Sequence, residues 1–442
     1  MRRAGASGSN AAASVFMERD RYLDALRVFA ILMVVSGHWL VRVIVETADG
    51  PSGVYLLNLS TELQWATLLW QVMPIFFFVG GVVNLQSWQR ARAAGESASG
   101  WVRRRAHGLL TPVLVFLAVL LPVALLTRLL GADEPMVFDF GVAVFPMWFL
   151  AVYLVVTSLT PLTVRLHEQG GGRLLLLGAG ALAVVLDLFR FTVGGPVVGT
   201  QPLISSPNFL LVWIVVHQLG YSWADGRFDG RGAALIWGAS GILAGMILLG
   251  PWPLSMVPFE GTTRPNNGAP PSAALIAMGV IQLGAAVALR NRVAGWIARP
   301  GVWAAIGLVG AHSVTIYLWH QPVMVAVANL AGAVGWVSPA PLFDAYWWAG
   351  RFAWVCGCLA VLIPVAGLAA RASRALQPVP RDAGAAVTVF GIALTCSGIA
   401  GIIAVGGSHP GLHPGLALAP PAVLLAGASL LGVFARRAER TG

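Results

Sequence analysis

Two residues in the first apolar stretch of this chain could perform chemistry inside a membrane. Arg27 and His38 are eleven residues apart, which is three helical turns plus about 20°, so in a helix both side chains project from one face. At about 1.5 Å per residue they lie about 16 Å apart along the helix. Ionisable groups inside a membrane are expensive to insert and are usually functional. The pair therefore suggests an anchor for an anionic substrate below a proton acceptor.

A second histidine is expected at the same depth. His38 lies about fifteen residues into the first apolar segment, and His320 about seventeen residues into a later segment that runs in the same direction. An imidazole suits general-base catalysis because its ordinary pKa of about 6.5 is close to physiological pH. A single buried histidine could equally be a packing group with a satisfied hydrogen bond. Two histidines at one level favour a shared function.

A basic run precedes the third apolar segment of the sequence. It consists of Arg103, Arg104, Arg105 and His107. Guanidinium groups match the oxygens of phosphates, so this run together with Arg27 could bind a phosphorylated substrate. Juxtamembrane arginines also hold helices in place and attract anionic lipid. The residues alone leave both interpretations open.

The elements that must position these groups follow from the composition. The mean hydropathy is +0.77, 57% of the residues are hydrophobic and only 10% are charged, whereas a soluble domain has about 25% charged residues. Apolar runs of about 20 residues recur along the chain, each long enough to cross about 30 Å of hydrocarbon. The strands of a β-barrel would be shorter and would alternate in polarity. The sequence therefore predicts an all-α, polytopic bundle of transmembrane helices.

The apolar runs and the arginines together predict the topology. Twelve spans are expected, near residues 23–45, 64–85, 108–131, 142–163, 173–190, 207–224, 232–250, 272–290, 303–328, 347–369, 385–406 and 416–435. The chain has no lysine, and 23 of its 28 arginines fall in the two termini and the even-numbered connections. By the positive-inside rule both termini are cytoplasmic, in an inner or plasma membrane. The basic balance is thus a topology signal and gives no reason to expect nucleic acid as a partner.

The chain divides into three parts. Residues 1–18 are small and polar and predict a disordered cytoplasmic tail without a cleavable signal peptide. Residues 19–370 form the main membrane domain, and residues 371–442 add two helices and a basic cytoplasmic tail. No metal site is expected, because the three cysteines lie within predicted spans and the pair His409 and His413 lacks a third ligand.

Further motifs occur in a fixed order along the chain. They are Tyr22-Leu-Asp24-Ala-Leu-Arg27 followed by ten residues and His38, Met73-Pro74-Ile-Phe76-Phe77-Phe78-Val-Gly80-Gly81, the basic run ending at Pro112, Met147-Trp148-Phe149-Leu150, and Tyr317-Leu-Trp-His320. In this order they resemble the acyltransferase 3 family of integral membrane acyltransferases, over about residues 19–370. Two positions depart from the family pattern. Many members have serine at the position of Gly80, and members commonly show Arg-x-x-Arg where this chain has Arg104 and His107.

The resemblance implies an activity and a core of about ten spans. Such proteins take an acyl group, usually acetyl, from acyl-coenzyme A in the cytoplasm and deliver it to a hydroxyl of an envelope glycan, a lipid or a secreted metabolite. Acyl-CoA is then a co-substrate, and no bound cofactor is implied. Arg27 and His38 match the arginine and histidine regarded as essential. Arg103–Arg105 and a charged His107 would assist Arg27 in binding the phosphates of coenzyme A, and Asp24 would pair with Arg27 and lower its insertion cost.

The resemblance also suggests a mechanism. His38 would take the proton of the acceptor hydroxyl as its oxygen attacks the thioester carbonyl. A nearby donor, Tyr317 or Trp148, would stabilise the oxyanion. His320 would orient the acceptor or donate a proton to the leaving thiolate.

A multi-span transporter or flippase is the alternative, because intramembrane ionisable groups also serve as proton relays. A transporter should show two similar halves, whereas the histidine-bearing spans, the first and the ninth, do not correspond in a six-plus-six division. Other polar groups within the spans are expected to have structural roles. His217, Gln218 and Gln282 predict interhelical hydrogen bonds, and Asp187 and Arg190 a local ion pair.

Overall fold

The protein is 79% helical with almost no sheet, so the expected all-α class is confirmed. The computed structural model describes residues 20–48, 50–129, 140–198, 201–258, 266–339, 341–376, 383–406 and 414–434. The tail expected at residues 1–18 lies outside these residues, as do His409 and His413.

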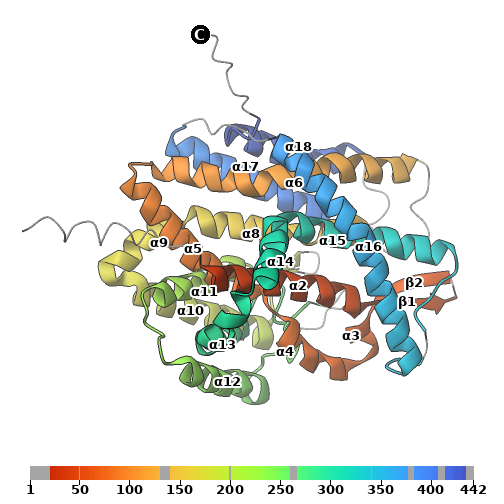
Figure 1. Ribbon diagram of the computed structural model, residues 1–442, viewed down its shortest axis with the longest axis horizontal. Helices are drawn as coiled ribbons and strands as arrows, with labels where there is room; N and C mark the ends of the chain where they lie inside the picture. The colour runs from red at the N-terminus through yellow and green to blue at the C-terminus, as the bar shows by residue number, and fades with distance from the viewer. Residues whose placement is uncertain are drawn as a thin grey trace, which may run out of the picture.

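The helices are numbered along the chain in Figure 1. They are α2 (Arg21–Val41), α3 (Leu56–Leu59), α4 (Thr67–Trp70), α5 (Met73–Ala93), α6 (Ala98–Leu129), α7 (Phe140–Val144), α8 (Met147–Ser158), α9 (Thr160–Leu166), α10 (Gly172–Leu188), α11 (Asn208–Ala224), α12 (Gly232–Leu249), α13 (Ala273–Ile297), α14 (Pro300–Ala311), α15 (Ser313–Ala333), α16 (Ala345–Ala375), α17 (Ala385–Gly406) and α18 (Pro414–Leu430). A 3₁₀-helix, η1 (Thr61–Ala66), and two π-helical turns, η2 (His167–Gly171) and η3 (Phe189–Val193), join some of them. Two short antiparallel hairpins complete the fold, β1 (Arg42–Thr47) with β2 (Gly50–Tyr55) and β3 (Val197–Val198) with β4 (Gln201–Pro202).

The multi-pass membrane architecture is supported by the lengths of these helices. Within the described residues, nine helical segments are long and apolar enough to cross a membrane, and the bent pair α14 and α15 would make a tenth. Each of the twelve predicted spans overlaps a helix. The remaining two of the twelve correspond to α11 and α18, which have 17 residues each and are shorter than the roughly 20 residues of a typical span.

Helix α2 begins and ends for identifiable reasons. Asp20 caps its first turn, since its side chain accepts hydrogen bonds from the backbone N–H groups of Tyr22 and Leu23. The helix ends at Val41, four residues before the predicted end of the first span. The next residues are the β-branched run 43–45, which favours a strand, and they pair with β2 as an antiparallel hairpin.

Helix α6 begins ten residues earlier than the span predicted at 108–131. The basic run therefore lies inside the helix and not in a connection. Residues four apart on a helix share a face, while residues two apart are separated by about 200°. Arg103 and His107 consequently lie on one face of α6, and Arg105 lies on the opposite face.

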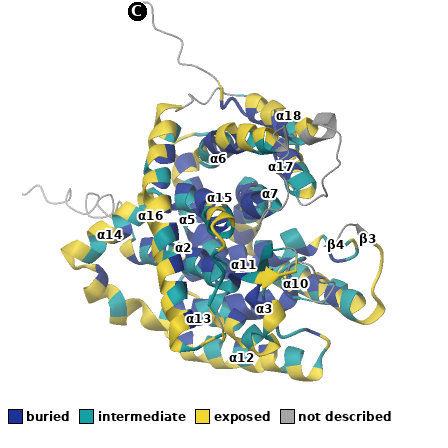
Figure 2. Ribbon diagram, turned by 90° about the vertical axis from the view of Figure 1, so that its right-hand side faces the viewer, coloured by how far each residue is buried: buried dark blue, intermediate teal, exposed yellow. Residues whose placement is uncertain are grey.

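The span predicted at 303–328 is broken. Helices α14 and α15 meet at His312 and are bent by 68° with respect to each other. Helix α14 packs against α2 but turns away from the centre of the bundle. Figure 2 shows that it carries many exposed residues. Buried residues concentrate on α5, α11 and α15. The first turn of α15 therefore starts inside the protein.

The last two helices lie beside the third span. In Figure 1, α17 and α18 run next to α6 along one side of the bundle, and α17 packs against α6, α7 and α8. The two helices approach each other closely through glycines. A Cβ atom placed on Gly398 would lie 2.5 Å from the backbone nitrogen of Leu424, and one placed on Gly427 would lie 2.5 Å from that of Thr395. Small residues at such positions allow tight interhelical packing.

Candidate active site

The two predicted histidines are in direct contact. Nδ1 of His38 on α2 lies 2.7 Å from Nε2 of His320 on α15, and the two rings are nearly parallel, with an interplanar angle of 7°. The side chain of His320 is fully buried, whereas His38 is partly exposed. The pair therefore joins a buried imidazole to one that a substrate can approach.

The hydrogen-bond partners of this pair assign its tautomers. Nδ1 of His320 lies 2.6 Å from the backbone carbonyl oxygen of Tyr317, and a carbonyl can only accept, so this nitrogen carries the hydrogen. The lone pair of a neutral His320 is then on Nε2, which accepts a hydrogen bond from Nδ1–H of His38. Nε2 of His38 is left with a free lone pair. It is the atom of the pair that can take a proton from a substrate.

The backbone around His38 is held by three neighbouring side chains. The indole nitrogen of Trp39 donates to the carbonyl of His320 at 3.0 Å. The carbonyl of Trp39 accepts from Trp354 at 3.1 Å and also from Nη2 of Arg351, which in addition donates to the carbonyl of Arg42 at 2.8 Å. Arg351 and Trp354 belong to α16. The carboxyl end of α2, with His38 in its last turn, is thus bonded to both α15 and α16.

A cavity of about 120 Å³ lies between α2, α5, α6, α8 and α15. Arg27, Arg105 and Tyr317 all line it. The side chain of Arg27 is 42% exposed, and its Nη1 lies 3.8 Å from Oδ1 of Asp24, so the expected ion pair is present. The ring centroid of Tyr317 lies 5.7 Å from that of His320. The cavity therefore connects two guanidinium groups with the immediate neighbourhood of the histidine pair.

A buried polar network positions Arg105. Its guanidinium donates to Oδ1 of Asn84 on α5. The amide nitrogen of Asn84 in turn lies 3.2 Å from Oγ1 of Thr157 and 3.1 Å from Nε2 of His217. Asn84, Thr157 and His217 are all buried. Sequence reasoning missed Asn84, although a polar residue within an apolar segment, one helical turn after Gly80, was a usable signal.

Tyr153 is a further residue of the cavity that the sequence did not indicate. Its ring lies against Gly80 on α5, where an added Cβ atom would be 2.9 Å from the tyrosine hydroxyl. Both residues line the cavity. Within the described residues the hydroxyl of Tyr153 has no hydrogen-bond partner, so it is available to a ligand. The absence of a side chain at Gly80 leaves room for this ring.

The comparison with protein families decides the class of this protein. The sequence model of the acyltransferase 3 family, described as an acyltransferase domain, matches residues 20–370. The chain belongs to the acyltransferase 3 family. It is an acyltransferase enzyme, and the transporter alternative is not supported. Comparisons with curated proteins and with solved structures found no match.

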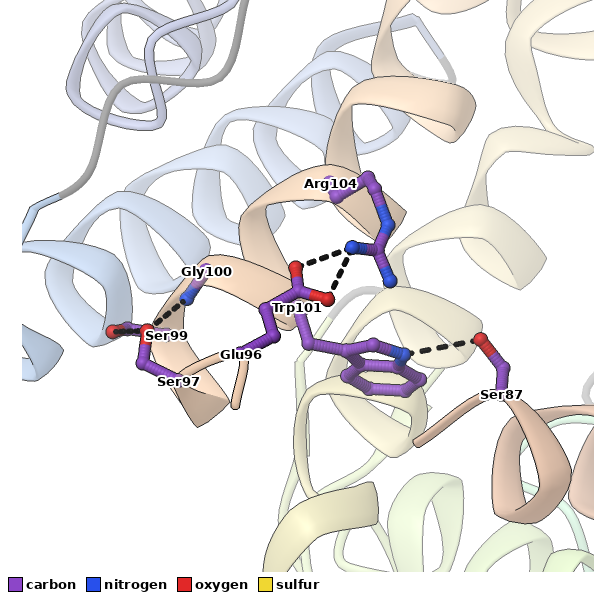
Figure 3. A network of polar contacts seen from close by, with 7 residues as sticks. All are labelled: Ser87, Glu96, Ser97, Ser99, Gly100, Trp101 and Arg104. Atoms are coloured by element: carbon purple, nitrogen blue, oxygen red, sulfur yellow. Dashed lines mark hydrogen bonds and ion pairs between the residues drawn. The ribbon is translucent and has the colours of Figure 1, made fainter. Parts of the chain in front are cut away.

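Three members of the acyltransferase's basic run lie away from the cavity. Arg104 forms an ion pair with Glu96, which precedes α6, as Figure 3 shows. Nη1 of Arg103 donates to the carbonyl of Leu430 at 2.9 Å. Nε2 of His107 lies 2.8 Å from the carbonyl of Leu431. Of the four residues in the run, the structure thus brings only Arg105 into the cavity with Arg27.

The two residues considered for an oxyanion donor have other contacts. The hydroxyl of Tyr317 donates to the carbonyl of Pro146 at 2.9 Å, so its hydrogen is already used. Trp148 packs among aromatic rings, with centroids 6.3 Å from Phe209 and 6.5 Å from Trp213, and it does not line the cavity. Both residues pack against Phe149, which lines the cavity. Neither is therefore assigned as the hydrogen-bond donor to the oxyanion.

The remaining polar predictions have mixed outcomes. The interhelical hydrogen bond expected for His217 is confirmed by its contact with Asn84 on α5. Gln218 contacts His167 in the π-helical turn η2 at 2.5 Å. Gln282 donates to the carbonyl of Gln71, the residue after α4, at 2.6 Å.

The expected direct ion pair between Asp187 and Arg190 is not found among the described residues. Arg190 instead donates to three loop carbonyls, those of Asn266, Ala269 and Pro270, because it reaches a loop that is distant in sequence. Asp187 accepts from the backbone nitrogen of Ala273 at the start of α13. No cluster of three metal-binding side chains occurs in the part of the chain that the structure describes.

Proposed function

We propose that this membrane acyltransferase takes an acyl group, most simply acetyl, from acyl-coenzyme A at the cytoplasmic side. It transfers this group to a hydroxyl of an envelope glycan, a lipid or a secreted metabolite on the other side of an inner or plasma membrane. The observation that carries the proposal is a cavity lined by Arg27, Arg105 and Tyr317. The ring of Tyr317 lies 5.7 Å from that of His320, the partner of His38. The distribution of arginines along the sequence supports cytoplasmic termini.

Coenzyme A carries several phosphates, and these are the groups that the two cavity arginines would bind. A guanidinium presents a planar fork of donors that matches phosphate oxygens. Arg27 is half exposed, and its one ion pair among the described residues is a long contact with Asp24, so it can turn to a phosphate. Arg105 is oriented by Asn84. Arg103, Arg104 and His107 make no direct contact with the donor in this proposal, because none of them lines the cavity.

The proposed reaction uses the free nitrogen of His38. The acceptor hydroxyl gives its proton to Nε2 of His38 while its oxygen attacks the thioester carbonyl carbon. The tetrahedral intermediate collapses, the carbon–sulfur bond breaks, and the proton on His38 passes to the leaving thiolate. An ester and free coenzyme A result, and His38 returns to its neutral state.

His320 would act through His38 in this reaction. Both of its ring nitrogens are already bonded, one to the carbonyl of Tyr317 and one to His38. Its Nε2 accepts from Nδ1–H of His38, which keeps the proton-accepting nitrogen on the substrate side and stabilises the imidazolium once it forms. This makes His320 a positioning residue and leaves protonation of the thiolate to His38.

The test is a substitution of His38 in the native host. The gene is deleted and complemented with wild type, with His38→Ala, or with Arg92→Gln, which alters an exposed ion pair with Glu168 at a helix end. Envelope glycans, lipids and secreted metabolites are then compared by mass spectrometry at matched protein levels. An acylated species should be lost on deletion and restored by wild type and Arg92→Gln. With His38→Ala it should be at least about 10²-fold lower, the usual contribution of a general base.

Feeding the cells with isotope-labelled acetate identifies the acyl group in the same experiment. Label in the restored species supports acetyl as the group transferred. If His38→Ala restores the species as well as wild type does, His38 is not the base and the proposed mechanism is wrong. If deletion changes no acylated species in any fraction, the proposed transfer itself is wrong.

A further inference from the structure

The two helices that follow the family match are bonded directly to the helix that carries Arg105. The match ends at residue 370, and α17 and α18 come after it. Arg103 and His107 on α6 contact the carbonyls of Leu430 and Leu431 at the end of α18. These contacts join residues more than 300 positions apart in the sequence.

The chemistry of these contacts is that of a helix cap. The last carbonyls of a helix have no partner within it and carry its partial negative charge. Arg103 supplies a permanent cation there, and His107 supplies an N–H donor, because a carbonyl accepts only. Arg103 and His107 are 2% and 6% exposed, and no bonding partner exists for the buried Nδ1 of His107 in the described residues. Loss of either contact would leave buried polar atoms unsatisfied.

The opposite face of α6 belongs to the cavity. Arg105 and Leu109 are four residues apart on this face, and both line the cavity. They alternate along the helix with Arg103 and His107, which face α18. A rotation of α6 that moved Arg103 off α18 would therefore turn Arg105 away from the cavity by the same angle.

The hairpin of α17 and α18 can resist such a rotation because it is packed tightly as a unit. Its two helices meet at Gly398 and Gly427, where no side chain would fit. Helix α17 is also packed against α6, α7 and α8, so the hairpin is anchored to the core at several places. It forms a fixed surface for one face of α6.

We propose that the C-terminal hairpin is a positioning element of the acyl-donor site, with Arg103 and His107 as the residues through which it orients Arg105 toward the donor. The inference rests on the proposed function, since it assigns Arg105 to donor binding. It gives a role to a segment outside the family match. It also accounts for the departure from the Arg-x-x-Arg pattern at His107. His107 faces α18, whereas Arg105, on the opposite face of α6, remains available to bind the donor.

The experiment measures binding of coenzyme A to purified, full-length protein in nanodiscs by isothermal titration calorimetry. The double variant Arg103→Ala/His107→Ala should bind about 10-fold more weakly than wild type. Arg103→Lys/His107→Gln, which retains a cation and a side-chain N–H, should recover most of the affinity. In an Arg105→Ala background the double variant should cause no further loss, because the effect acts through Arg105. Arg92→Gln is the matched control and should bind as wild type does.

The outcomes separate the inference from the function on which it rests. If wild type binds coenzyme A and the double variant binds equally well while its melting temperature falls, the hairpin only stabilises the fold and the inference is wrong. A loss of affinity that is unchanged in the Arg105→Ala background also overturns it. Failure of the wild type to bind coenzyme A overturns the proposed donor instead. Should the double variant not fold, the single variants Arg103→Ala and His107→Ala, each expected to weaken binding about 3-fold, decide the matter.

Discussion

The histidine pair and the arginine-bearing cavity share α2, yet they are held in opposite ways. Within the described residues every nitrogen of the pair is bonded except Nε2 of His38, and Trp39 and Arg351 fix the backbone beside it. Arg27, in contrast, is 42% exposed and keeps one ion pair at 3.8 Å. A group that makes and breaks bonds must stay in one geometry to be effective. A group that binds a long, flexible co-substrate gains from being able to change its conformation. Arg105 lies between these two cases, because Asn84 holds its guanidinium while the side chain still lines the cavity.

Loss of the buried histidine is the largest effect expected from this comparison. His320→Ala removes the acceptor for Nδ1–H of His38, so the ring can rotate or change tautomer, and the maximal rate should fall by about 10²-fold. His320→Gln should retain more activity, because its amide oxygen can accept the same hydrogen bond. The measurement is the initial rate of label transfer from acetyl-CoA in membranes. Equal activity of the two variants would contradict the proposed role of His320.

Substitution of the adjustable arginine should act on binding. Arg27→Gln removes one charged partner of a phosphate, and the KM for acyl-CoA should rise about 10-fold, as expected for a lost charge-assisted hydrogen bond. The maximal rate should stay within about twofold of wild type, since the histidine pair is untouched. Arg27→Lys keeps the charge without the planar fork and should give an intermediate KM. A large fall in the maximal rate with an unchanged KM would place Arg27 in the chemical step instead.

The smallest effect is expected at the contact between Gly80 and Tyr153 in the cavity wall. Gly80→Ala would push the ring of Tyr153 aside, and Tyr153→Phe would remove a hydroxyl that has no hydrogen-bond partner among the described residues. Each change should raise the KM for acyl-CoA about 3-fold, and the double variant should be no worse than either single one, because neighbouring residues are not additive. Additive effects would show that Gly80 and Tyr153 act separately.

Much of the histidine pair could be predicted from the sequence. Helix rise fixes depth, and two ionisable groups within apolar segments were conspicuous, so His38 and His320 were expected at one level. The structure places them in contact although the span containing His320 is bent at His312. His320 is only the eighth residue of α15, so its contact with His38 comes from the packing of α15 against α2 and not from the number of residues counted along the span.

The cavity could be predicted only in part. Arg27 and the basic run were visible, but the sequence could not say which arginine of the run would face inward. That choice depends on where α6 begins and on the carbonyls of Leu430 and Leu431, which no local pattern reveals. Asn84 and Tyr153 were missed for a similar reason. A single asparagine or tyrosine in an apolar segment acquires meaning only through its neighbours in space.

The hydrogen bond from Trp39 to the carbonyl of His320 has a consequence for the permeability of the membrane. It ties α2 to α15 at the level of the reacting atoms, and Arg351 ties the same end of α2 to α16. Carriers expose a site to each side in turn by rocking helices against one another, and any such movement of α2 against α15 or α16 would break these bonds. In the proposed reaction the helices stay in place and only the acyl group changes sides. Such an enzyme can export a chemical group while the cell keeps its ion gradients.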